Sequence, residues 1–187
     1  MQAFLMHIGS PGNIDVSYTI TKKRHRDELL ANLPSRSNEE QFFRSDATLL
    51  AAFPSGEFNC WGIPPGAKQR LRETQIGDLV LFFPAIGHNG GLEYFGIVKA
   101  KCEFECWDSS RILWPKTPNQ RLFPHLIFFD SEAGERSWFD FLDDIGYSHD
   151  FDPRGFYRRI GDWRFNKFGG QAGYLDFLRN QLGFGPI

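Results

Sequence analysis

Hydrophobic residues along this chain fall mostly into runs and alternations that are typical of β-strands. Residues 79–83 (Leu-Val-Leu-Phe-Phe) form a continuous apolar run that follows the polar turn Gly77-Asp78, as expected for a strand that is buried on both faces. Gly and Asn residues at positions 85–91 then predict a hairpin loop. On such grounds we predict strands at residues 3–8, 16–20 (an alternating edge strand), 79–83, 94–107 and 123–129.

Helical spacing and capping residues predict several short helices between and after these strands. Ser37 precedes an acidic turn and an apolar face, which is the pattern of a capped helix start. Residues 58–66 contain two prolines and two glycines and are interpreted as a stiff loop, with a second rigid loop at residues 114–120. The predicted helices are residues 27–33, 37–53, 67–72, 137–142 and 171–182. Several strands with few, short helices indicate an α+β domain with a β-barrel-like sheet.

Composition limits the class of protein without fixing its function. The 187 residues suffice for one domain, and the formal net charge of -2 excludes a wholly basic nucleic-acid coat but not a local basic face. The chain has only three cysteines, and because this number is small and odd we expect no disulfide framework. The sequence has no leader pattern and no apolar stretch of about 18 residues, so we expect a cytoplasmic protein without membrane contact.

Motifs for catalysis, metals and cofactors are weak in this sequence. It contains no Gly-x-Ser-x-Gly, His-Glu-x-x-His or phosphate-binding glycine loop. His149-Asp150-Phe-Asp152 resembles a fragment of a metal site but has no second ligand cluster, and Cys60 lies among apolar residues that do not favour a nucleophile. We therefore expect no metal, no cofactor and no catalysis. The basic residues 22–26 are either a solvated segment or a phosphate-contacting patch.

Two tryptophans are better candidates for function. Trp61 and Trp114 each lie in a segment rich in Pro and Gly, one before and one after the predicted hairpin. Two parallel, solvent-reachable indoles would sandwich a planar base, and stacking on an aromatic ring contributes about 1–3 kcal/mol per base. The alternative is that both indoles only anchor loops to the core.

The order of these features resembles the EVE and YTH domains of the PUA-like superfamily. The resemblance rests on Trp61-Gly62, the short helix after it, Ile76-Gly-Asp-Leu-Val-Leu-Phe-Phe83 and Tyr94-Phe-Gly-Ile-Val98. EVE domains have similar strands, and YTH domains cage N6-methyladenine with tryptophans at the matching positions. The resemblance covers about residues 1–130. It implies one EVE/YTH-like domain over residues 1–187, with a PUA-like small mixed β-barrel at about 1–130 and a helical C-terminal extension at about 131–187.

The resemblance also implies a function, which is binding of a modified base that is flipped out of nucleic acid, DNA in preference to RNA. In prokaryotes such domains accompany nuclease or NTPase modules in modification-dependent restriction of the McrBC or HNH type, so such a module of the same or another chain is an expected partner. Gly62 stands where YTH domains often have a small polar residue, which leaves methyladenine, methylcytosine and hydroxymethylcytosine open. The expected base-binding residues are Trp61, Trp114, Gly62, Asn59 and Ser10, and the expected phosphate-binding residues are Lys68, Arg70, Lys116 and Arg121.

Two other functions are compatible with the sequence. ASCH-type relatives of this fold include amidohydrolases that act on modified nucleosides with a lysine and a carboxylate, for which Lys99 with Glu93 or Asp130 are the candidates here. A structural or protein-interaction module, in which the aromatic residues are only core, is the third possibility.

Overall fold

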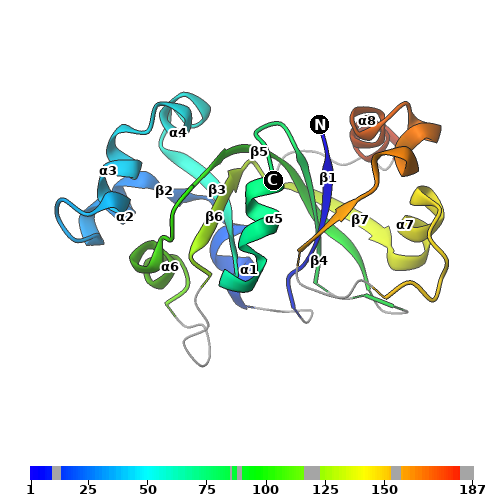
Figure 1. Cartoon of the computed structure of the whole chain (residues 1–187), viewed down its shortest axis with the longest axis horizontal. Helices are drawn as coiled ribbons and strands as arrows, with labels where there is room; N and C mark the ends of the chain where they lie inside the picture. The colour runs from blue at the N-terminus through cyan, green and yellow to red at the C-terminus, as the bar shows by residue number, and fades with distance from the viewer. Residues whose placement is uncertain (10–13, 85, 88–89, 116–122, 153–156, 182–187) are drawn as a thin grey trace. The chain divides into compact units, whose positions relative to one another are not determined.

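The chain divides into two units. Figure 1 shows the computed structural model of the whole chain, coloured from the N- to the C-terminus. The structure describes residues 1–9, 14–84, 86–87, 90–115, 123–152 and 157–181. Unit 1 comprises Met1–Asn13, Gly77–Ile97 and Ser131–Ile187, and unit 2 comprises Ile14–Ile76 and Val98–Asp130. Strand β5 (Gly91–Lys101) contributes its first residues to unit 1 and its last residues to unit 2. The organisation as one domain stays a prediction.

Unit 1 is built on a mixed sheet. Its strands are β1 (Ala3–His7), β4 (Leu79–Phe83), β7 (Glu132–Ser137), β8 (Tyr157–Ile160) and the first part of β5, in the order β7-β5-β4-β1-β8. β1 runs parallel to β4, whereas the other pairs are antiparallel. All five residues of β4 are buried, as the apolar run predicts for a strand covered on both faces.

Helical segments of unit 1 pack against every second residue of its strands. These segments are α7 (Trp138–Ile145), the 3-10 helix η3 (Asp162–Phe168) and α8 (Gln171–Gln181). Because side chains alternate along a strand, residues two apart share a face and pack into one core with the helices. That core contains Ala3, Leu5, Leu79, Leu81, Phe83, Trp138, Phe141, Leu142, Phe165, Tyr174 and Leu178.

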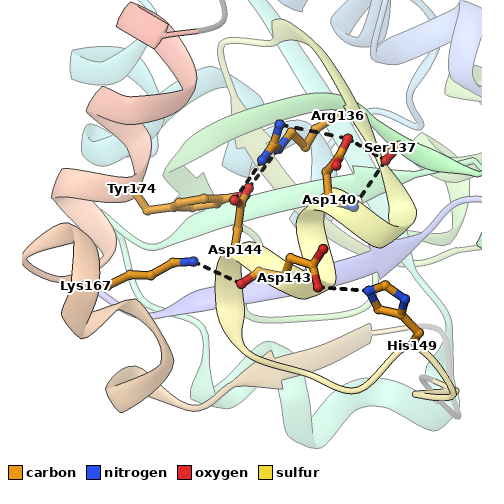
Figure 2. Close-up of polar contacts among 8 residues, drawn as sticks. All are labelled: Arg136, Ser137, Asp140, Asp143, Asp144, His149, Lys167 and Tyr174. Atoms are coloured by element: carbon orange, nitrogen blue, oxygen red, sulfur yellow. Dashed lines mark hydrogen bonds and ion pairs between the residues drawn. The ribbon is translucent and has the colours of Figure 1, made fainter.

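A buried polar network joins three elements of unit 1 (Figure 2). The Arg136 guanidinium on β7 donates two hydrogen bonds of 2.8 Å to the carboxylate of Asp144 on α7. The Tyr174 hydroxyl on α8 lies 3.4 Å from the same carboxylate. Burial, followed by the negative charge of Asp144, raises the pKa of Tyr174 well above its ordinary value. The phenol therefore stays protonated and can donate to Asp144.

Unit 2 contains an antiparallel sheet. Its strands are β2 (Arg24–His25), β3 (Glu57–Ile63), β6 (His125–Phe129) and the end of β5. β2 pairs with β3, β3 pairs with β6, and β6 pairs with the end of β5. The helices of unit 2 are α1 (Ile14–Thr19), α2 (Arg26–Asn32), α3 (Asn38–Ser45), α4 (Ala47–Ala52), the 3-10 turn η1 (Pro65–Ala67), α5 (Lys68–Glu73) and α6 (Trp107–Leu113). No helix in the described part of the chain is long and apolar enough to span a bilayer.

Several local predictions differ from the structure. The helix expected over residues 37–53 is divided into α3 and α4, which are separated by Asp46. Residues 16–19 belong to helix α1 and Ile20 to the turn after it, so no edge strand forms there. Most of the stiff loop at 58–66 is strand β3. The strand expected through residue 107 ends at Lys101. Helix α6 then begins at Trp107. Residues after 130 contain strands β7 and β8 in addition to the predicted helices.

Candidate functional site

Strand β3 and the end of helix α6 bring Trp61 and Trp114 together. The centroids of the two rings are 5.9 Å apart, and the ring planes make an angle of 77°. Trp61 is 1% exposed and Trp114 is 3% exposed. The prediction that the tryptophans meet is therefore confirmed. The prediction of parallel walls open to solvent is wrong for this structure, because the rings meet edge to face and are buried.

Phe123 is a third member of this cluster and was not predicted. Its ring centroid lies 6.3 Å from that of Trp61 at an angle of only 24°, and 6.2 Å from that of Trp114 at 82°. Its backbone N–H donates to the Ser110 hydroxyl of α6 at 3.0 Å. The sequence contains a usable signal, because Phe123 lies two residues before the strand that pairs with β3. We call Trp61, Trp114 and Phe123 the aromatic cluster.

Gly62 allows the aromatic cluster to close around the backbone of β3. A Cβ atom at this position would lie 2.3 Å from the Phe123 Cβ, 2.6 Å from the Phe123 carbonyl oxygen and 2.9 Å from the Trp114 ring. These distances are too short for any side chain, so glycine is required for the observed packing. Gly66, four residues on, has no atom within 4 Å of the same position and provides a natural comparison.

Asn59 lies on the same strand, and its side-chain amide already has structural partners. The Nδ2 group donates to the Ile20 carbonyl at 2.8 Å and to the Thr19 carbonyl at 3.3 Å. It thereby satisfies carbonyls at the C-terminal end of α1, which a helix leaves without intrahelical partners. Its predicted role at a base edge stays a prediction.

The expected phosphate ligands in the described residues are exposed but have carboxylate neighbours. Lys68 Nζ lies 3.7 Å from Glu105, and Arg70 donates to Glu73 at 2.6 Å. Such surface pairs contribute only about 0–1 kcal/mol, so a phosphate can displace them at low cost. Ser10, Lys116 and Arg121 lie outside the described residues.

His125 is a buried polar residue beside the aromatic cluster that sequence reasoning missed. It pairs with Ile63 across β3 and β6, two residues beyond Trp61, and it is 1% exposed. Neither ring nitrogen has a hydrogen bond among the described residues, and the nearest carboxylate, Glu105, is 4.0 Å away. Burial lowers the pKa of His125, the Lys68 charge lowers it further, and Glu105 opposes both. A histidine within the apolar run of β6 is the signal that was available.

The remaining candidates from the sequence are Cys60 as a nucleophile and His149 as a metal ligand, and the described residues do not surround either with the groups such a site needs. Burial raises the pKa of the Cys60 thiol, which disfavours the reactive thiolate. His149 lies 2.8 Å from the Asp143 carboxylate on the surface (Figure 2), and the described residues contain no group of three potential ligands that could hold a metal.

The residues considered for an amidohydrolase form a surface ion pair. Asp130 contacts Lys99 and lies 3.3 Å from Lys23, and it is about half exposed. Burial raises the pKa of Asp130, but the contacts with both lysines outweigh this effect and lower it overall. Glu93 belongs to unit 1, whereas this pair belongs to unit 2.

Comparison with known structures identifies the fold. The chain aligns with the "N-terminal domain of Thermococcus Gammatolerans McrB bound to m5C DNA" over 97% of its own length and 99% of that chain, with a TM-score of 0.64 and 23% sequence identity. The chain has the fold of this McrB domain. The α+β class predicted from the sequence is thus confirmed, and the PUA-like assignment stays a prediction. No protein-family model matches the sequence, and neither does any curated protein.

Because the alignment with the McrB domain covers nearly the whole chain, it includes residues from both units. At 23% identity the match is a similarity of fold, so the roles of individual residues need their own support.

Proposed function

We propose that this chain binds DNA that contains a modified base, and that the aromatic cluster receives the base after it is flipped out of the helix. The observation that carries the proposal is the fold similarity to a McrB domain bound to m5C DNA. The cluster supports it, because three aromatic rings around a backbone that lacks a side chain at Gly62 offer stacking surfaces at close range.

Binding in this way requires the rings to separate. Trp61 and Trp114 are in edge-to-face contact, so a base cannot lie between them until at least one ring moves. The free energy for that movement must come from stacking and from phosphate contacts, which is an induced fit. Lys68 and Arg70 are suited to supply phosphate contacts by exchanging their carboxylate neighbours for DNA, and we propose the same role for Lys116 and Arg121.

His125 is proposed as a polar contact for the base. A neutral imidazole has one donor and one acceptor, and a buried polar group without a hydrogen bond costs about 1–3 kcal/mol. A base edge that reaches His125 would recover part of this free energy. We propose Asn59 and Ser10 as further polar contacts for the base. We also propose that a nuclease or NTPase module, of the same or another chain, is the partner of this domain.

The test is a binding measurement with matched duplexes that contain either cytosine or 5-methylcytosine. We expect the wild-type chain to prefer the methylated duplex and Trp61→Ala to lose that preference, because loss of stacking weakens binding by about 5- to 150-fold. Since removing a buried tryptophan costs about 3–5 kcal/mol of stability, Trp61→Phe is the companion variant that keeps a ring in place. It should retain part of the preference. Equal affinity of the wild-type chain for modified and unmodified duplexes, with methyladenine also tried, would remove the proposal.

A further inference from the structure

A series of stacked planar groups in unit 1 leads from the core to the surface. The buried Trp138 ring stacks with Phe151 at a centroid distance of 6.3 Å and an angle of 17°, and Phe151 stacks with Tyr147 at 3.9 Å and 13°. The Arg164 guanidinium carbon lies 3.5 Å from the Tyr147 ring centroid and 4.3 Å from that of Trp163. Each group thus contacts the next, and Trp163 is the outermost member.

Trp163 is held in place although it is 65% exposed. Arg164, which contacts its ring, is itself fixed by hydrogen bonds of 3.1 Å to the Ile145 carbonyl and 2.6 Å to the Gly146 carbonyl at the end of α7. Gly161 leaves room beside the indole, because a Cβ there would lie 3.0 Å from the Trp163 Nε1 atom. The indole is therefore positioned by its neighbours without being covered by them.

Three cations lie along this stack or close to Trp163 in sequence, and none has a carboxylate partner among the described residues. Among the described residues, Arg158 contacts the Phe151 ring at 5.0 Å and has no ion pair. Lys167 Nζ donates to the Asp143 carbonyl at 2.9 Å and is visible in Figure 2. The hydrogen bonds of Arg164 to described residues likewise go to carbonyl oxygens. By contrast, Arg159 pairs with Asp162 at 2.8 Å. Arg164 in contact with Trp163, Arg158 on the stacked Phe151 and Lys167 on the same 3-10 helix are thus positive charges that an anionic partner could use.

We propose that Trp163 is a stacking platform for an unpaired base of a DNA strand, and that Arg158 and Lys167 contact the adjacent phosphates. An exposed indole with nearby cations is the combination that binds single-stranded DNA without sequence preference. A purely apolar protein surface would leave those charges without partners, which disfavours it as the occupant. The proposal goes beyond the modified-base site, since it lies in the other unit and requires no modified base.

The experiment measures binding of the whole chain to an unmodified single-stranded oligonucleotide of about 16 nucleotides. We expect Trp163→Ala to weaken binding by about 5- to 150-fold, and Trp163→Phe to weaken it less because a ring remains. Ile76→Ala, which shortens another exposed apolar side chain at 56% exposure, should leave binding within about twofold of wild type. Affinity of Trp163→Ala equal to that of wild type, or no binding by wild type, would overturn the proposal.

The phosphate contacts have a separate signature. Arg158→Gln and Lys167→Gln should each reduce the slope of log affinity against log salt by about 0.7, as expected for one phosphate contact to a single strand. An unchanged slope in both variants would contradict the assignment of these cations. If wild type shows no preference for methylated duplexes but Trp163→Ala still loses affinity, the proposed function fails while the platform stands. If wild type prefers methylated duplexes but Trp163→Ala binds the single strand as tightly as wild type does, the platform proposal fails and the proposed function stands.

Discussion

At the scale of single residues, the clearest difference between expectation and structure concerns Trp61 and Trp114. Their proximity was predictable, because both tryptophans lie in Pro- and Gly-rich segments on either side of the same predicted hairpin. Their mutual angle was not, because it depends on Phe123 and on the space above Gly62. Those contacts join positions that are about sixty residues apart, and local patterns carry no information about them.

His125 predicts how stability depends on pH. Its pKa is lowered in the folded chain, so the unfolded chain binds more protons below its ordinary pKa of about 6.5. Stability should thus be retained above that pH and fall as the pH drops through the window below it, with a slope of at most about 1.4 kcal/mol per pH unit for one proton. Urea unfolding at about pH 7 and pH 5 measures this effect.

The matched variants for this test are His125→Leu and His149→Gln. Replacing the buried imidazole should reduce the loss of stability on acidification, whereas replacing the exposed His149 should leave the loss nearly as in wild type. The charged groups near His125 are Glu105 and Lys68, and both remain in either variant. A pH dependence that is identical in wild type and His125→Leu would show that His125 does not stay neutral in the folded chain.

At the scale of elements, long apolar runs were predictable and context-dependent elements were not. β4, and β6 after its first residue His125, consist of continuous apolar residues, so local pattern and final burial agree. Residues 16–20 alternate, but Val16, Thr19 and Ile20 are the buried positions, which is helical spacing. Helix α6 contains Ser109 and Ser110, which do not favour helices. Its first N–H groups are satisfied by the Glu39 carboxylate.

The link between β7, α7 and α8 can be tested with two neighbouring aspartates. Asp144→Asn leaves Arg136 without its bidentate carboxylate partner, so we expect the free energy of unfolding to fall by about 2–3 kcal/mol, somewhat below the ~3–5 kcal/mol of a fully buried pair. Asp143→Asn, on the same helix, removes only an exposed contact with His149 and should cost less than about 1 kcal/mol. Denaturant unfolding of both variants gives the comparison, and equal losses would mean that the buried network does not stabilise the unit.

At the scale of the whole molecule, the α+β class was predictable because strand and helix patterns lie in contiguous segments of the sequence. The Gly-Asp turn, the strand after it and the return strand are local features, and the structure has β4 and β5 at these positions. The division of the chain into two units was not predictable, since each unit combines segments that are far apart in the sequence. The same holds for β7 and β8, whose short, polar sequences give little hydrophobic pattern.

The most direct test of the proposed function compares two glycine variants in their preference for methylated over unmethylated duplexes. Gly62→Ala forces Phe123 and Trp114 to move, because the new Cβ would lie within 3 Å of both, whereas Gly66→Ala meets no atom within 4 Å. We predict that wild type and Gly66→Ala share the same ratio of the two dissociation constants and that Gly62→Ala brings this ratio close to one. A folded Gly62→Ala variant with the full wild-type ratio would contradict binding of the modified base at the aromatic cluster.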